Sequence, residues 1–192
     1  YFQTVASVIF PSSVTASIWA YKVMIGGFYV LAAVYLWKIN AEFVSQDRRH
    51  RWAAFAYSPL LIVTAFVDGH NDVMMMALTI ASVYYLFKKR YTPAFLLWTA
   101  GFLVKYMNAI QLPLMVLLVY REMRPAGTAA FLRFAAAQLL LNVLFAVAAF
   151  WPIWGGEGTF LAIVRCAPLF YTNSFPYAIH RVLELLHLAP SA

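Results

Sequence analysis

Long apolar runs separated by short polar and basic loops constrain the fold of this chain more than any other feature. The runs cover residues 14–37, 52–67, 73–87, 93–120 and 134–151. The first run alone is long enough to cross a hydrocarbon core of ~30 Å as a helix that rises ~1.5 Å per residue. With 64% hydrophobic and 11% charged residues, the chain has too few polar side chains to cover a surface that faces water. The sequence therefore predicts an all-α, polytopic transmembrane helix bundle.

The run 93–120 is interrupted by Lys105 and Pro113, which are both costly in an unbroken helix that faces lipid. We therefore expect a re-entrant or short-helix pair here, with one segment going out and one coming back. This layout places the loops 38–51, 88–92 and 121–133 on one side of the membrane.

Those three loops carry most of the basic residues of the chain. They hold ten of the 14 Lys and Arg residues: Lys38, Arg48, Arg49, Arg51, Lys88, Lys89, Arg90, Arg121, Arg124 and Arg133. The positive-inside rule makes this side cytoplasmic. The net charge of +7 then reflects membrane topology, and no nucleic-acid partner is predicted. We predict a multi-pass protein of the plasma (inner) membrane, surrounded by membrane lipids, whose active face is non-cytoplasmic.

A polar cluster between two apolar runs is the main candidate for chemistry. Asp68, His70 and Asp72 are expensive to keep at a membrane boundary. They are candidates for a general base, for divalent-metal ligands, or for acceptors of sugar hydroxyls. An ordinary polar turn is the alternative, in which Asn71 or Asp72 caps the helix that starts at Val73. A divalent cation is possible and no other cofactor is predicted, because the single Cys166 excludes a cysteine-based metal site.

Lys105 is the second candidate, because an ionisable residue inside an apolar run usually has a functional partner. A lipid phosphate, Asp68 or Asp72 are the possible partners, and a snorkelling side chain is the alternative. Arg165 and Arg181 are candidate cations for the same phosphate. Three other polar features are given structural roles: Lys22 as a snorkelling side chain, Gln138 and Asn142 as hydrogen-bonding partners of a neighbouring helix, and His180, Glu184 and His187 as the polar face of an interfacial helix.

Several motifs, in this order, resemble bacterial multi-pass glycosyltransferases of the GT-C superfamily, in particular the polyprenol-phosphate-mannose-dependent mannosyltransferases. The motifs are Tyr57-Ser58-Pro59-Leu60, Gly69-His70-Asn71-Asp72, Lys88-Lys89-Arg90, Leu103-Val104-Lys105, Gln111-Leu112-Pro113-Leu114 and Asn173-Ser174-Phe175-Pro176-Tyr177.

The resemblance implies a hexosyltransferase that moves a sugar, with mannose favoured, from a polyprenyl-phosphate donor to a lipid or glycan acceptor. It implies a catalytic role for Asp68, His70 and Asp72 as a second acidic site, and a contact of Lys105 with the donor phosphate. Asn71 and Asn173 are further candidates for substrate binding. In such enzymes an acid in the first outer loop usually serves as the base. We expect residues 1–192 to be one transmembrane domain of a longer protein, lacking the first span, the first outer loop and that base.

Two other classes of function share the predicted architecture. A secondary transporter also contains a broken helix with charge near the midplane, but it predicts an inverted repeat, and the 52–87 and 93–120 hairpins differ in polar content. A non-catalytic scaffold subunit would use the polar cluster only for assembly.

Overall fold

The computed structural model describes residues 13–44, 47–154 and 156. Within these residues all regular structure is helical and no strand occurs, which confirms the predicted all-α class. The chain divides into two compact units, Tyr1–Val147 and Ala148–Ala192, and every contact discussed below lies in the first. The elements are α2 (Val14–Phe43), α3 (Arg48–Ala56), α4 (Pro59–Ile62), the π-helix η1 (Val63–Asp68), α5 (Asp72–Phe87), α6 (Tyr91–Val104), the 3₁₀ helix η2 (Tyr106–Gln111), α7 (Leu112–Met123), η3 (Arg124–Ala126), α8 (Thr128–Phe150) and η4 (Trp151–Ile153).

Two helices in the described part of the chain are long and apolar enough to cross a membrane, judged by length and composition. They are α2 and α8. In α8 only 6% of the most apolar stretch is buried, against 28% in α2. Almost the whole apolar surface of α8 is therefore open to its surroundings. The helices α5 and α6 are apolar but shorter.

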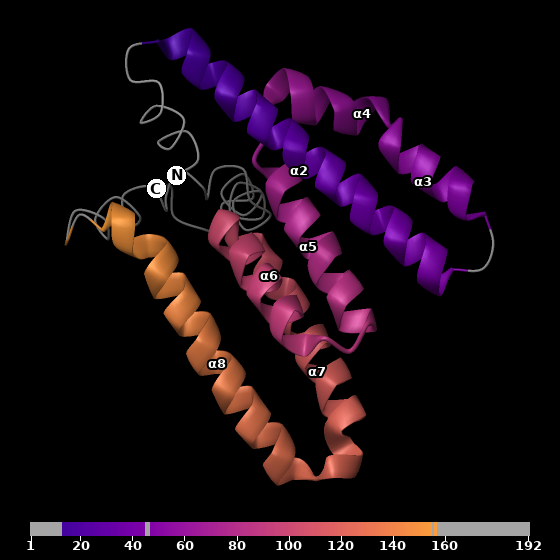
Figure 1. The fold of residues 1–192 in the computed structure, drawn as a ribbon, viewed down its shortest axis with the longest axis vertical. Coiled ribbons are helices and arrows are strands. Elements are labelled where there is room, and N and C mark those ends of the chain that lie inside the picture. The colour runs from indigo at the N-terminus through magenta and orange to yellow at the C-terminus, as the bar shows by residue number, and fades with distance from the viewer. Residues whose placement is uncertain (1–12, 45–46, 155, 157–192) are drawn as a thin grey trace, which may run out of the picture. The chain divides into compact units, whose positions relative to one another are not determined.

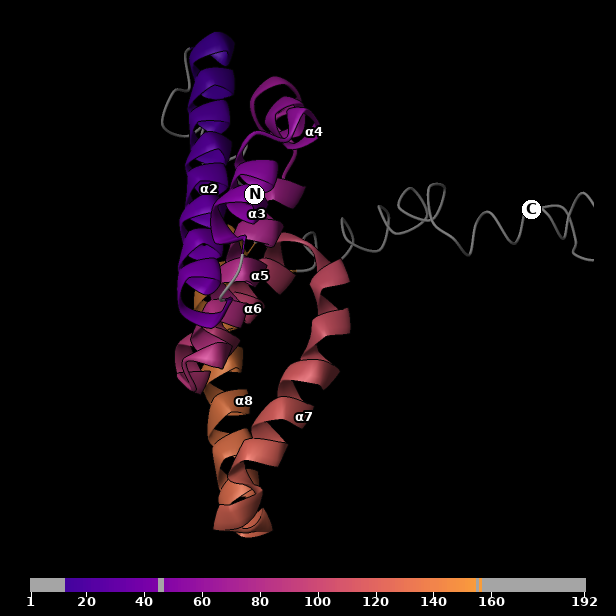
Figure 2. The same ribbon diagram turned by 90° about the vertical axis from the view of Figure 1, so that its right-hand side faces the viewer.

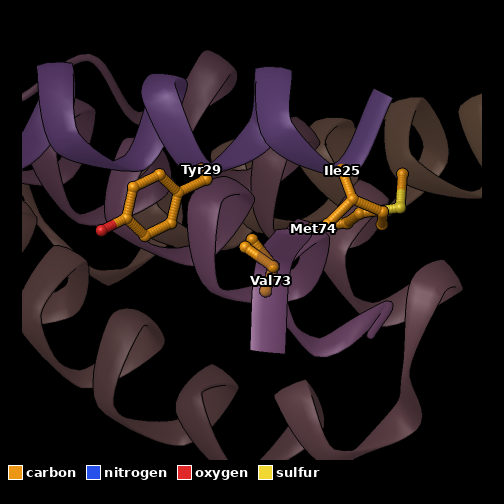
Figure 3. Close-up of a cluster of buried hydrophobic side chains, with 5 residues drawn as sticks. Ile25, Tyr29, Val73 and Met74 are labelled. Atoms are coloured by element: carbon orange, nitrogen blue, oxygen red, sulfur yellow. The ribbon is translucent and has the colours of Figure 1, made fainter. Parts of the chain in front are cut away.

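Helix α5 packs against both α2 and α6 and lies between them (Figure 1). Ile25 and Tyr29 of α2 meet Val73 and Met74 of α5 in a buried cluster that Ala65 of η1 completes (Figure 3). The Tyr29 hydroxyl donates to the carbonyl oxygen of Ala56 at 2.9 Å, so the polar end of this buried ring has a partner. The cluster fixes the start of α5 against α2.

The apolar run 52–67 is divided into two helical segments. Helix α3 ends at Ala56, and a new helix begins at Pro59. Proline disfavours helical backbone in the residue before it, and Ser58 accordingly has an extended ψ of 115°. The run is then completed by α4 and η1.

The break predicted within 93–120 is present. Helix α6 ends at Val104, and Lys105 has extended backbone, with φ −154° and ψ 123°. Pro113 lies in the first turn of α7, where its missing N–H costs nothing.

The buried side chain of Asn108 holds this break in place. It donates to the Trp98 carbonyl oxygen at 3.1 Å and accepts from the Thr79 hydroxyl at 2.9 Å. The Trp98 indole N–H also donates to the Asn108 carbonyl oxygen at 2.9 Å. A Cβ added to Gly101 would lie 2.7 Å from the Asn108 side-chain nitrogen, so only glycine allows this approach. The break is therefore anchored to both α5 and α6.

Polar side chains join α8 to α6, as predicted for Gln138 and Asn142. Gln138 donates to the Thr92 hydroxyl at 2.8 Å, and Asn142 accepts from the Thr99 hydroxyl at 2.6 Å. Helices α7 and α8 diverge from the turn that joins them (Figure 2). The hydrogen bonds to α6 therefore supply a direct attachment for α8 beyond that turn.

Two ion pairs bring the three basic loops to one end of the unit. Lys88 Nζ lies 2.5 Å from Glu42 Oε2, and Lys89 pairs with Glu122. The hydrogen bond with the Glu42 carboxylate raises the pKa of Lys88, and the bond with the Glu122 carboxylate raises the pKa of Lys89. The end of α2, the α5–α6 turn and the end of α7 are thus tied together.

Candidate active site

Asp72 and Lys105 form an ion pair at the opposite end of α5 from the basic loops. Asp72 is the first residue of α5, and Lys105 lies at the break between α6 and η2. The Lys105 ammonium donates to Asp72 Oδ1, and the two side chains are 34% and 40% exposed. Of the partners considered for Lys105, the structure selects Asp72. A half-exposed ion pair keeps both charges close to the surface, where a substrate can reach them.

His70 contacts the second oxygen of the same carboxylate. Its Nδ1 atom lies 3.1 Å from Asp72 Oδ2, and the Asp72 backbone N–H donates to the same nitrogen at 3.4 Å. Asp72 therefore has a separate partner for each carboxylate oxygen. The neutral imidazole suits the backbone contact, whereas the protonated ring suits the ion pair.

The local backbone explains how His70 reaches Asp72. The π-helix η1 ends at Asp68, and the next residue, Gly69, has a left-handed φ of 63° that favours glycine. The His70 N–H then bonds back to the Thr64 carbonyl oxygen at 3.0 Å. This reversal turns the chain directly into α5.

Lys22 supports this turn from α2. Its ammonium donates to the Val67 carbonyl oxygen at 2.8 Å, close to the end of η1. The side chain was expected only to snorkel, and its partner 45 residues away could not be inferred from hydropathy. The position of this lysine inside a long apolar run is the one feature of the sequence that could have indicated a structural role.

A cleft of about 430 Å³ opens beside the ion pair. Most of its lining is apolar, and Asp72 and Lys105 are the charged residues among the described residues that line it. The lining residues are Leu61, Thr64, Asp72, Val73, Met75, Met76, Lys105 and Met107. The three methionines were not singled out from the sequence, because Met in an apolar run looks like core. Flexible thioether side chains suit an apolar ligand of irregular shape.

The other predicted site residues make no contact with His70, Asp72 or Lys105 that the structure describes. Asp68 and Asn71 are exposed, and neither side chain makes an ion pair or hydrogen bond within the described residues. Asn71 precedes α5 but its side chain does not cap it. Arg165, Asn173 and Arg181 lie outside the described residues, as do His180, Glu184 and His187.

No group of three His, Cys, Asp or Glu side chains in the described part of the chain is placed to hold a metal ion. His70 and Asp72 are together, but Asp68 does not join them. A divalent cation at this cluster therefore stays a prediction that would need further ligands.

No curated protein and no solved structure matches the chain. A family profile described as alpha-(1->6)-mannopyranosyltransferase, N-terminal domain, matches residues 1–121. The matched segment is more than half of the 192 residues, and it includes His70, Asp72 and Lys105. The chain therefore belongs to this mannosyltransferase family.

Proposed function

We propose that this chain is part of a GT-C-type enzyme that transfers mannose from a polyprenyl-phosphate donor to a lipid or glycan acceptor. Membership of the mannosyltransferase family supports glycosyl transfer. The observation that carries the proposal further is the Asp72–Lys105 ion pair at the edge of an apolar cleft. A sugar linked to a lipid phosphate needs an apolar surface, a cation for the phosphate and an acid–base group within one small region.

The proposed topology is a polytopic bundle in the plasma membrane with its active face non-cytoplasmic. The basic loops joined by the Glu42–Lys88 and Lys89–Glu122 pairs are on the cytoplasmic side. Helix α5 has 16 residues and so puts Asp72 ~24 Å from that side. Because α5, α6 and α7 are shorter than a full span, they pack within the bundle, with α2 and α8 facing lipid.

In the proposed reaction, Asp72 acts as the base toward the acceptor. Its carboxylate takes the proton of the acceptor hydroxyl while the hydroxyl oxygen attacks the anomeric carbon, with inversion. The bond from that carbon to the phosphate oxygen breaks, and the electron pair leaves with the lipid phosphate. Lys105 stabilises the negative charge that grows on this phosphate.

The ion pair itself implies an order of events. A donor phosphate competes with the Asp72 carboxylate for the Lys105 ammonium, because both are anions. Donor binding then loosens the pair and leaves Asp72 Oδ1 free to accept a proton. His70 stays on Oδ2 and holds the carboxylate in position.

The remaining candidates complete the proposal. Arg165 and Arg181 are proposed as further contacts of the donor phosphate, and Asn71 and Asn173 as contacts of the sugar or acceptor. A divalent cation is not needed in the reaction as written, since Lys105 carries the charge of the leaving group.

The test compares two carboxylates of the same loop in the full-length protein. Asp72→Asn should lower the rate of mannose transfer from a radiolabelled polyprenyl-phosphate-mannose about 10²–10⁴-fold, the usual worth of a general base. Asp68→Asn, a matched change four residues away, should leave the rate nearly unaltered because the Asp68 side chain is exposed and forms no ion pair or hydrogen bond within the described residues. Equal effects of the two variants, in protein that remains folded, would contradict the assignment of Asp72.

A further inference from the structure

The basic end of the unit is more positive than its internal ion pairs can neutralise. The loops 38–51, 88–92 and 121–133 contain ten Lys and Arg and only three acids, Glu42, Asp47 and Glu122, an excess of seven that equals the net charge of the whole chain. Glu42 and Glu122 are already paired with Lys88 and Lys89. The excess charge must therefore find its counterions outside the described residues.

Among the exposed arginines of this end that have no acidic partner in the described residues, three lie close in sequence to Lys89 and Glu122. Arg90 follows Lys89 in the α5–α6 turn, whereas Arg121 and Arg124 flank Glu122 at the end of α7. The Lys89–Glu122 pair holds these two segments together, so the three arginines lie at the same end of the unit. Lys38 differs, since its ammonium lies 5.1 Å from the Tyr35 ring centroid and 5.7 Å from that of Tyr84.

The chain beside these arginines is apolar and equally exposed. Phe87 is 47% exposed, Tyr120 is 38% exposed and Leu132 is 59% exposed. A soluble anion would use the cations alone, whereas a phospholipid uses both: its phosphate meets guanidinium groups and its acyl chains cover the apolar side chains. The combination favours a lipid over a free phosphate or a nucleic acid.

We propose that Arg90, Arg121 and Arg124 bind the headgroups of anionic phospholipids at the basic end of the unit. The proposal rests on the membrane placement given under the proposed function. Anionic lipid surfaces attract nearby Lys and Arg residues, and the planar guanidinium can bind a phosphate with two hydrogen bonds. The site lies at the far end of α5 from Asp72 and Lys105, so it is separate from the transferase site.

The test measures lipid preference of the purified full-length protein by native mass spectrometry. Phosphatidylglycerol and phosphatidylcholine of equal chain length are added in a mixed micelle, and bound molecules of each are counted. The wild-type protein should retain phosphatidylglycerol preferentially. Arg121→Gln with Arg124→Gln should reduce that preference about tenfold, and added salt should weaken it in the wild type.

Arg121→Lys with Arg124→Lys is the matched control, because it keeps the charge and should keep most of the preference. Arg90→Gln alone should give a smaller loss of the preference for phosphatidylglycerol. This single variant replaces the double glutamine variant in the test if the latter does not fold. A wild-type protein without preference for phosphatidylglycerol, or a glutamine variant that keeps it, overturns the proposal.

Extraction with alkaline carbonate separates this inference from the proposed function. A chain that stays in the membrane but lacks lipid preference refutes only the lipid site. A chain that carbonate removes from the membrane refutes the membrane placement on which both proposals rest.

Discussion

Asp68 and Asp72 show how surroundings decide the role of a residue. They have the same side chain, lie four positions apart and flank the same turn. Asp68 ends η1 and is exposed, whereas Asp72 starts α5 and has Lys105 on one oxygen and His70 on the other. Of the two, only Asp72 combines a nearby cation with access to the cleft, and for this reason Asp72 is the one proposed as the base.

Lys105 should affect the chemical step more than substrate binding. We predict that Lys105→Met lowers kcat for mannose transfer about 10²–10³-fold, because the negative charge on the leaving phosphate is larger in the transition state than in the bound donor. Lys105→Arg keeps a cation and should recover a measurable part of the rate. Steady-state kinetics with the lipid-linked donor provide the measurement. A Met variant whose KM rises while kcat is unchanged would show that Lys105 contributes only uniform binding.

At this scale the sequence singled out three side chains that the structure brings together, His70, Asp72 and Lys105, but it left the partner of Lys105 open. Asp72 was one of the partners considered for Lys105, because an ion inside an apolar run needs a counter-charge. The contact of His70 with the second oxygen depends on the left-handed backbone at Gly69 and on η1 before it. A shift from α to π hydrogen bonding leaves the hydropathy of a segment unchanged, so it cannot be read from residue types.

At the scale of elements, the break between α6 and α7 depends on close packing of Gly101 against Asn108. We predict that Gly101→Ala lowers the melting temperature, since the new Cβ would meet the Asn108 side-chain nitrogen at 2.7 Å and disturb its bonds to Trp98 and Thr79. Lost hydrogen bonds of a buried amide cost about 1–3 kcal/mol.

Gly27→Ala is the matched control for this change. Gly27 lies in α2, and a Cβ there meets no atom within 4 Å, so alanine should leave stability unaltered or raise it slightly. Thermal melts of both variants in the same detergent make the comparison. If Gly101→Ala melts no earlier than Gly27→Ala, the break does not depend on this contact.

The elements also show where pattern reasoning succeeds and where it fails. The break at Lys105 was predictable because polar residues and Pro113 interrupt an apolar run. The split of 52–67 at Pro59 was missed, although proline was visible, because the flanking residues are apolar and resemble a continuous segment. Hydropathy detects burial in lipid or core, but it does not register where the backbone changes direction within apolar sequence.

At the scale of the whole unit, the lysine–glutamate pairs should make stability depend on pH in the alkaline range. The carboxylates of Glu42 and Glu122 raise the pKa values of Lys88 and Lys89 above their ordinary value of 10.5. From neutral pH up to that value the contribution of these pairs is therefore complete, and it is lost as the pH rises through the higher pKa of the folded state.

A double variant isolates this contribution. Glu42→Gln with Glu122→Gln should melt slightly below the wild type at neutral pH, and the gap should be constant up to about pH 9 and close above about pH 11. Groups that titrate in both proteins change both melting temperatures equally, so they cancel in the difference. A gap that widens with rising pH would contradict the assignment.

The placement of the two functional ends on opposite sides of a membrane is testable by accessibility. We predict that a membrane-impermeant maleimide added outside labels Asn71→Cys but neither Arg90→Cys nor Arg121→Cys, with Cys166 replaced by serine throughout. Helix α5 separates Asn71 from Arg90, and the Lys89–Glu122 pair puts Arg121 at the same end as Arg90. The two inner positions should label only after permeabilisation, which also controls for reactivity. Labelling of Arg121→Cys from outside would make 93–120 a single crossing of the membrane. The Lys89–Glu122 ion pair and the proposed non-cytoplasmic active face would then contradict each other.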